Sequence, residues 1–249
     1  MKTSLANDIQ RAIEDAAGGA QPLPETSYHK GDVYLSYGLR APEFWKIVKA
    51  FRPRVLSLSL EDRLQAAEAL LAKQIGELGH AGIYILALSS EDLGPKQFNY
   101  LDRQIDHFRG WSHVDHFCSD VMQPVLWRFP EESIALHETW VGAENKWRRR
   151  SSVVTFTRKV GESGQFTDQV LSFCDQLIWD SEDLVQKGVG WALKDNLRGD
   201  HNKVLAYIKE LRRMGVPSTI TLYAIRDLKG EERQAILAVK KQKKSSQDE

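Results

Sequence analysis

The chain has 249 residues, and its 34 lysines and arginines balance its 34 aspartates and glutamates, so the formal net charge is zero. This balance excludes a uniformly basic nucleic-acid coat protein, and no apolar run reaches the roughly 18 residues that a membrane-spanning helix needs. The two cysteines, Cys118 and Cys174, lie far apart and indicate free thiols in a reducing compartment rather than a disulfide framework. The N-terminus lacks the apolar core of a signal peptide, so we expect a soluble cytoplasmic protein with no membrane partner.

Charge is distributed unevenly along this neutral chain. Residues 144–159 contain six lysines and arginines against one acid, Glu144, and a second basic cluster opens the C-terminal tail at residues 240–244. The segment through Glu25 leans acidic. A neutral total can therefore conceal a local positive face suited to a polyanion.

Helical periodicity dominates from about Ala41 to Val239, after a polar N-terminal segment that we expect to be flexible to about residue 25. Ser59, followed three residues later by Asp62, resembles the capping box that starts a helix. The run at residues 83–86 (IYIL) is too short to assign from periodicity, and its surroundings favour a buried helix. The first strong repeat predicts one helix whose apolar residues recur at spacings of three and four, namely Leu60, Leu64, Ala67, Leu71, Ile75 and Leu78.

Two later repeats predict further helices. One of them ends at Gly215, and Pro217 suits the first turn of the helix that follows. Helix pairs recur at about 40 residues without a Gly/Ser/Pro-rich linker, which predicts HEAT-like repeats in a single domain, residues 1–249. The polar tail from about residue 243 is expected to be flexible. The apolar positions of the two repeats are Phe166, Val170, Phe173, Cys174, Leu177 and Ile178, then Val204, Ile208 and Leu211.

Trp111 and Asp115 form the first constellation that could carry chemistry. They are four residues apart, so a helix would project both from one face, one turn apart. An indole beside a carboxylate suits a positively charged reaction centre. The structural alternative is a half-buried tryptophan next to a solvated or capping aspartate.

Residues 146–150 (KWRRR) form the second constellation. Three consecutive arginines on a helix point in different directions, so at most two can face one ligand. One interpretation has Arg150 and a neighbour neutralising phosphates while Trp147 packs beneath them. The other is a solvated charged face.

The third constellation is the glycine pair before Trp191. Gly188 and Gly190 lie inside a helical pattern, where each costs about 1 kcal/mol relative to alanine. Such glycines indicate either close helix packing or the close approach of a ligand. Packing around a core tryptophan is the simpler interpretation.

Metal and cofactor motifs do not emerge from the sequence. His113 and His116 stand three residues apart, but no matching ligand pair completes a metal site. Phosphate-binding loops, dinucleotide fingerprints, nucleophile elbows and zinc-protease motifs are missing as well. We therefore expect no metal and no cofactor.

Taken together, these segments resemble the AlkD-like DNA alkylation repair family, the HEAT-like-repeat DNA glycosylases. Residues 37–43 (YGLRAPE) resemble the family's Gly-hydrophobic-x-x-Pro-Glu entry to its second repeat, and residues 111–115 (WSHVD) its Trp-Asp-x-Val-Asp segment. Residues 147–150 (WRRR) resemble its Trp-x-x-Arg, and residues 190–195 (GWALKD) its Gly-Trp-x-Leu-Arg-Glu. The four motifs follow the family's order across residues 28–228.

The resemblance implies a right-handed α-solenoid whose concave basic face holds duplex DNA, working as a monomer. It makes Asp115 the catalytic carboxylate, Trp111 and Trp191 aromatic walls and Arg150 a phosphate clamp. Two departures, Ser112 and the pair Lys194–Asp195, put the substrate range in doubt, because lysine cannot copy a bidentate arginine contact. The residues expected to bind DNA are Tyr28, Arg148, Arg149, Arg150, Lys187 and Lys194.

The implied function is base excision repair by a monofunctional glycosylase that removes cationic N3- or N7-alkylpurines from duplex DNA without flipping the base. One alternative is a non-catalytic reader of DNA structure on the same scaffold. Another is a protein-binding repeat scaffold with no nucleic-acid role. Retention of Asp115, Trp111 and Trp191 favours the enzyme over the reader.

Overall fold

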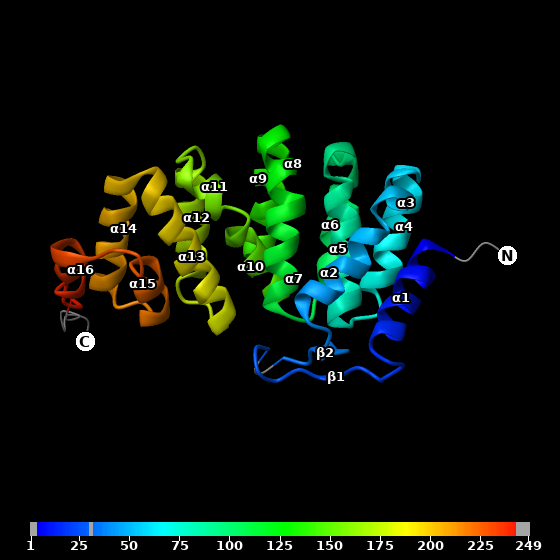
Figure 1. The fold of residues 1–249 in the computed structure, drawn as a ribbon. Helices are drawn as coiled ribbons and strands as arrows, with labels where there is room; N and C mark the ends of the chain where they lie inside the picture. The colour runs from blue at the N-terminus through cyan, green and yellow to red at the C-terminus, as the bar shows by residue number, and fades with distance from the viewer. Residues whose placement is uncertain (1–3, 30–31, 243–249) are drawn as a thin grey trace. The chain divides into compact units, whose positions relative to one another are not determined.

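The computed structural model describes residues 4–29 and 32–242. This part of the chain consists of α-helices joined by short turns, with a small antiparallel strand pair (Figure 1), which confirms the prediction of an all-α fold. The chain divides into two compact units, Met1–Leu136 and His137–Glu249, called unit 1 and unit 2 below. The single repeat domain, the handedness of a solenoid and its concave face stay predictions. None of the described helices is long and apolar enough to cross a membrane.

Unit 1 contains the strand pair and most of the short helices. Strands β1 (Leu23–Pro24) and β2 (Leu35–Ser36) are antiparallel, with Leu23 opposite Ser36. The 3₁₀ turns are η1 (Ser90–Asp92), η2 (Pro95–Gln97) and η3 (Ile105–His107), and η4 (Cys118–Met122) is a π-helical turn. The α-helices are α1 (Leu5–Ala16), α2 (Ala41–Ala50), α3 (Arg52–Leu56), α4 (Leu60–Leu71), α5 (Gly76–Leu88), α6 (Phe98–Gln104), α7 (Trp111–Phe117), α8 (Gln123–Arg128) and α9 (Pro130–Val141), the last shared with unit 2.

The N-terminal segment is more ordered than its polar composition indicates. Residues 5–16 form α1, whose Ser4 side chain accepts a hydrogen bond from the backbone N–H of Asn7. Leu5, Ile9 and Ile13 recur every four residues and are buried, so one face of a mostly polar helix packs into unit 1. The polar composition of this stretch did not indicate that helix, and the flexibility of the segment to about residue 25 stays a prediction.

The first strong repeat forms two helices rather than one. Helix α4 ends at Leu71, and α5 begins at Gly76 after a turn in which Gln74 adopts a left-handed φ of 58°. The two helices pack against each other (Figure 1), because Gly82 lets α5 approach the Ala67 carbonyl of α4. The chain reverses between α4 and α5, but the apolar residues on both sides of the turn face the same core and keep their spacing of three and four. The spacing of apolar residues therefore could not reveal where the first helix ends. The capping bond from Asp62 N–H to Ser59 Oγ and the helix over residues 83–86 are both confirmed.

Unit 2 is organised around its longest helix, α13. Helices α10, α11 and α15 make most of the contacts with α13, and α12 and α14 complete them. As predicted, α14 ends at Gly215, whose φ is 73°, and Pro217 precedes α15. The tail from residue 243 lies outside the described residues. The helices are α10 (Lys146–Val154), α11 (Arg158–Glu162), α12 (Thr167–Leu177), α13 (Asp183–Gly199), α14 (His201–Met214), α15 (Ser218–Ala224) and α16 (Gly230–Leu237).

Candidate functional site

Helix α7 carries two of the expected site residues. Trp111 is its first residue and Asp115 lies one turn further, and both are half-buried. The helix continues into the π-helical turn η4, which precedes Pro124. Because proline has no N–H to donate to the carbonyl four residues back and its ring crowds that carbonyl, the wider turn accommodates it.

Trp111 is fixed by the segment between β1 and β2. Its indole N–H donates to the backbone carbonyl of Tyr28 at 3.1 Å, and the His29 ring stacks near it with centroids 5.3 Å apart. His29 in turn stacks on Tyr34, with centroids 3.7 Å apart and an interplanar angle of 5°. The Glu25 carboxylate accepts backbone hydrogen bonds from Ser27, Tyr28 and His29 and so shapes the segment. Tyr28 therefore meets Trp111 through its backbone, while its own side chain is 77% exposed.

The buried His29 and the half-buried His80 and His116 form a hydrogen-bonded chain next to this tryptophan. Ser112 Oγ lies 3.4 Å from His29 Nε2 and 3.3 Å from His80 Nε2, and His80 Nδ1 lies 3.1 Å from His116 Nδ1. In a bond between two imidazole nitrogens one ring donates and the other accepts, so the accepting ring is neutral. Ser112 stands where the family's motif carries an acid, and its hydroxyl joins His29 and His80.

Burial lowers the pKa of each of these rings. It lowers the pKa of His116 to about 4, with Asp120 acting in the opposite direction, and lowers that of His80 well below its ordinary value. His113, whose Nε2 lies 3.0 Å from the Gly76 carbonyl, has a pKa lowered to about 4 for the same reason. No group of three or more metal-ligating side chains is arranged for a metal ion within residues 4–29 and 32–242.

The three consecutive arginines lie on α10 in unit 2, and Arg149 and Arg150 both hold protein groups. Arg149 makes a two-pronged ion pair with Asp180, at 2.6 Å and 3.2 Å, and also donates to the carbonyls of Ala143 and Glu144. Arg150 is 4% exposed, and its guanidinium donates to the Leu184 carbonyl in the first turn of α13. Arg148 is half-buried. These bonds tie α10 to the start of α13, a structural task that the sequence pattern did not reveal.

Helix α13 carries the remaining expected residues. Trp191 is half-buried, so it is not the core tryptophan of the simpler interpretation. Lys187 is exposed and pairs with Asp183 at 2.5 Å. Lys194 pairs with the buried carboxylate of Asp195 at 2.9 Å.

The glycine pair before Trp191 is explained by helix packing. A Cβ at Gly190 would lie 2.7 Å from Tyr223 Cβ and 2.9 Å from the Ile220 carbonyl of α15. A Cβ at Gly188 would only touch Arg150, Val153 and Val154 at 3.4 Å. Gly190 therefore allows α15 to approach the turn of α13 that presents Trp191.

Arg158 is a site-like residue that the motifs did not single out. Its backbone φ is 55°, its N–H donates to Asp195 Oδ2 at 2.6 Å, and its guanidinium lies 5.5 Å from the centre of the Trp191 ring. The only sequence signal was its place in the basic segment 144–159.

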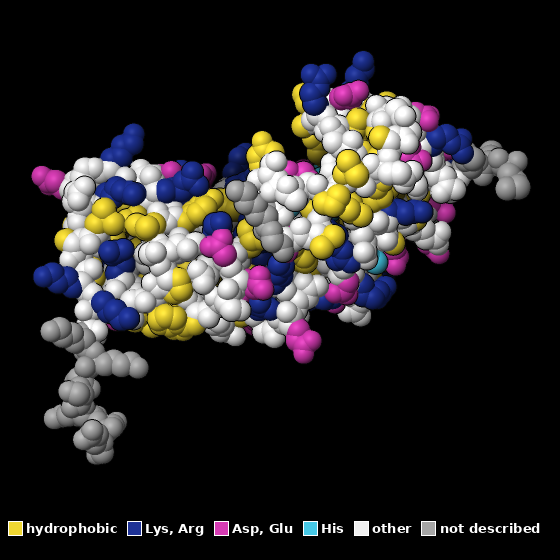
Figure 2. Space-filling model, turned by 90° about the horizontal axis from the view of Figure 1, so that it is seen from below, with side chains coloured by type: hydrophobic (Ala, Val, Ile, Leu, Met, Phe, Trp, Pro, Cys, Tyr) yellow, Lys and Arg dark blue, Asp and Glu magenta, His cyan; other side chains and the backbone are white. Residues whose placement is uncertain are grey.

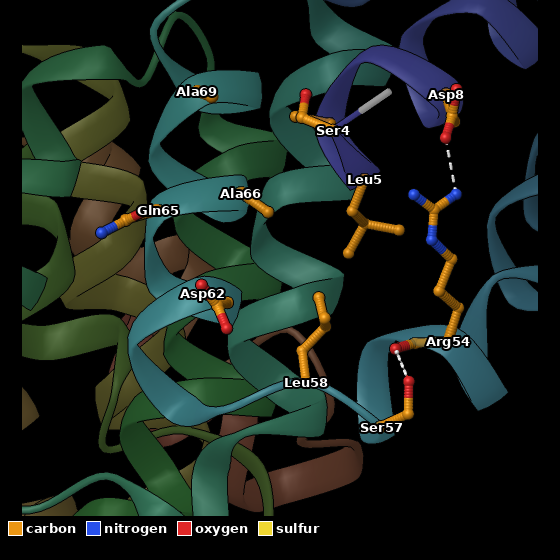
Figure 3. Close-up of a pocket in the computed structure, with 11 residues that line it drawn as sticks. Ser4, Leu5, Asp8, Arg54, Ser57, Leu58, Asp62, Gln65, Ala66 and Ala69 are labelled. Carbon is orange, nitrogen blue, oxygen red and sulfur yellow. Dashed lines mark hydrogen bonds and ion pairs between the residues drawn. The ribbon is translucent and has the colours of Figure 1, made fainter. Parts of the chain in front are cut away.

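Two surface pockets of unit 1 contain none of the expected residues, whereas a pocket of about 230 Å³ in unit 2 is lined by Lys194 among others. A cavity of about 840 Å³ lies among α1, α3 and α4 (Figure 3), where Asp8 pairs with Arg54. A smaller cavity, about 240 Å³, is lined by Trp45, Glu77 and His80 among others. On the face drawn in Figure 2, basic side chains are scattered among acidic and apolar ones.

Comparisons with known proteins place the chain in a family. The model of a family described as DNA alkylation repair enzyme matches residues 9–228. A solved structure, described as a predicted DNA alkylation repair enzyme from Enterococcus faecalis, superposes with a TM-score of 0.67 at 15% identity, covering 89% of this chain and 95% of that one. At this identity the likeness shows the fold alone. No curated protein matches the chain. Because the family model spans most of the sequence, the chain belongs to the DNA alkylation repair enzyme family.

Proposed function

We propose that this protein is a DNA glycosylase that hydrolyses the N-glycosidic bond of cationic N3- or N7-alkylpurines in duplex DNA. Family membership supports a role for an enzyme in alkylation repair. The observation that carries the finer proposal is on α7, where the Asp115 carboxylate follows one turn after an indole that Tyr28 and His29 hold in place. A fixed aromatic ring beside a carboxylate suits a cationic reaction centre.

The chemistry needs few protein groups. Alkylation at N3 or N7 places a positive charge on the purine, so the base leaves without being protonated. As the bond from C1′ to the base breaks, positive charge builds on the sugar, and the Asp115 carboxylate stabilises it. Water then forms the new bond to C1′ and gives its proton to Asp115, which returns it to solvent. The base departs neutral and an abasic site stays in the strand.

We assign to Trp111 and Trp191 the role of contacting the cationic nucleoside. An indole face contributes about 0.5 to 2 kcal/mol to holding a cation, depending on how dry the contact is. Trp191 already receives a cation in this way, since the Arg158 guanidinium lies over its ring. Contacts with sugar and backbone alone allow the lesion to stay stacked, so we include the absence of base flipping in the proposal.

DNA binding is assigned to Tyr28, Arg148, Arg149, Arg150, Lys187 and Lys194. Arg149, Lys187 and Lys194 each hold a carboxylate in the free protein, so a phosphate must replace or join that partner. The buried Arg150 must give up or share its bond to the Leu184 carbonyl. We propose no metal, no cofactor and no lyase step, since the proposed mechanism uses water as the only nucleophile.

The test is release of free N7-methylguanine and N3-methyladenine from methylated duplex DNA by the wild type and by Asp115→Asn. We expect wild-type release to fall about 100-fold or more in the variant, equivalent to roughly 3 kcal/mol of barrier. The matched control is Asp120→Asn, because Asp120 follows on the same helical segment and its side chain is 52% exposed. Release unchanged in Asp115→Asn would remove this carboxylate from the reaction, and no release by the wild type would overturn the proposal.

A further inference from the structure

Arg158 has an unusual backbone for its position. Among the described residues, the non-glycine residues with positive φ are Gln74 and Arg158. Gln74 comes just after α4, where a left-handed residue commonly ends a helix. Arg158 instead begins α11, where helical geometry requires a negative φ. The strain at Arg158 is therefore not explained by a helix end.

A buried carboxylate holds this strained backbone. The Arg158 N–H donates to Asp195 Oδ2 at 2.6 Å, and the Asp195 side chain is 2% exposed. The other oxygen, Oδ1, pairs with Lys194 at 2.9 Å, which supplies a charge for a carboxylate taken out of water. Asp195 thus fixes the position of a single exposed residue on a neighbouring helix.

The same face of α13 also meets the Arg158 side chain. Trp191 lies one turn before Asp195, and its ring centre is 5.5 Å from the guanidinium carbon. Arg158 is exposed, and in the part of the chain that the structure describes no carboxylate pairs with its guanidinium. Asp195 holds the Arg158 backbone, and Trp191, one turn earlier on α13, lies beside the guanidinium. The cation is therefore presented to solvent beside the indole. Strain maintained in this way is typical of functional sites.

We propose that Arg158 binds a phosphate of the DNA backbone next to Trp191, with Asp195 as the residue that positions it. The ligand is a phosphodiester, because a guanidinium with an aromatic partner retains its full charge and its donor fork for an oxyanion. The identity of that phosphodiester as duplex DNA rests on the proposed function.

The experiment measures binding of undamaged duplex DNA between about 50 and 200 mM salt for the wild type, Arg158→Ala and Arg158→Gly. Loss of one phosphate contact lowers the slope of log affinity against log salt by about 0.9. Both variants are expected to show that loss. Glycine adopts a φ of 55° without strain, so Arg158→Gly should melt at a higher temperature than Arg158→Ala. If Arg158→Gly is well folded and still shows a reduced salt slope, the loss of DNA binding is not caused by a loss of folding.

Arg226→Ala is the matched control. Arg226 is also exposed, and its guanidinium lies over an aromatic ring, 4.8 Å from the centre of Tyr223, but its φ is not positive. It should keep the wild-type slope. Asp195→Asn should shift the slope toward that of Arg158→Ala and add nothing in the double variant, which a purely structural role would not produce.

The inference is overturned if both Arg158 variants keep the wild-type slope, if Arg226→Ala loses as much, or if the wild type does not bind duplex DNA. These readouts need no base release. A wild type that binds DNA with this slope dependence but releases no alkylpurine would contradict the proposed function and leave the phosphate contact standing.

Discussion

At the scale of single residues, Trp111 shows how the fold prepares a functional side chain. Its anchor is a backbone carbonyl, that of Tyr28, rather than the tyrosine ring, and the ring of His29 covers one side. The motif alone predicted that Trp111 and Asp115 share a helical face, and α7 confirms that placement. The anchor itself comes from a segment about 80 residues earlier, which no local pattern could indicate.

Trp111→Phe should destabilise the protein by about 0.5 to 1.5 kcal/mol, because a phenyl ring replaces the indole and the hydrogen bond to the Tyr28 carbonyl is lost. Urea unfolding measures the change. Tyr28→Ala keeps that carbonyl and removes a side chain that is 77% exposed, so it should stay within about 0.5 kcal/mol of the wild type. A larger loss in Tyr28→Ala than in Trp111→Phe would contradict this anchor.

The buried histidines predict acid sensitivity. Burial lowers the pKa of His113 and of His116 to about 4 in the folded protein, against an ordinary pKa of 6.5 in the unfolded chain. Between these values the unfolded chain binds more protons than the folded one, so the free energy of unfolding falls as the pH falls from about 6.5 to about 4. The stabilisation that these lowered pKa values contribute is fully present above pH 6.5 and is lost as the pH falls from about 6.5 to about 4. His29 and His80 add to the loss, and Asp120 opposes it at His116.

Urea unfolding of the wild type at several pH values between 7 and 4.5 tests this. Replacing His116 by Gln should make the dependence shallower, because one titrating group with a lowered pKa is gone. Equal slopes for wild type and His116→Gln would contradict burial as the cause.

At the scale of elements, periodicity predicted helices at residues 60–78, 166–178 and 204–211 and failed where the chain turns back on the same core. Residues 60–78 kept their spacing across the α4–α5 turn, and the polar α1 concealed a regular apolar stripe. The glycine pair was noticed from its cost in a helix, but its reason needed the structure. Gly190 has α15 against it, and Trp191 next to it is half-exposed rather than core.

Gly190→Ala should destabilise the protein by about 1 to 3 kcal/mol, since the added methyl meets the Ile220 carbonyl at 2.9 Å and Tyr223 Cβ at 2.7 Å. The melting temperature and urea midpoint measure the loss. Gly142→Ala, where a Cβ would meet nothing within 4 Å, should be neutral or slightly stabilising. A neutral Gly190→Ala would mean that α15 is free to move away.

At the scale of the whole molecule, each unit contributes a different part of the candidate chemistry. Unit 1 holds a carboxylate and a fixed indole on α7, and unit 2 holds a second indole, an arginine over it and the arginines of α10. The sequence motifs named these residues except Arg158, because short motifs keep their order along the chain. It could not predict that Arg149 and Arg150 already hold protein partners, since Asp180 and Leu184 lie 31 and 34 residues away along the chain.

The most direct measurement of the central claim follows a labelled methyl group in N7-methylguanine within duplex DNA. If the protein is a glycosylase, the label leaves the strand as free N7-methylguanine, and abasic sites accumulate in equal amount. If the label instead leaves as a one-carbon product or passes to the protein while guanine stays in the strand, the lesion is repaired by direct removal of the alkyl group. That result would contradict hydrolysis of the glycosidic bond and the role assigned to Asp115.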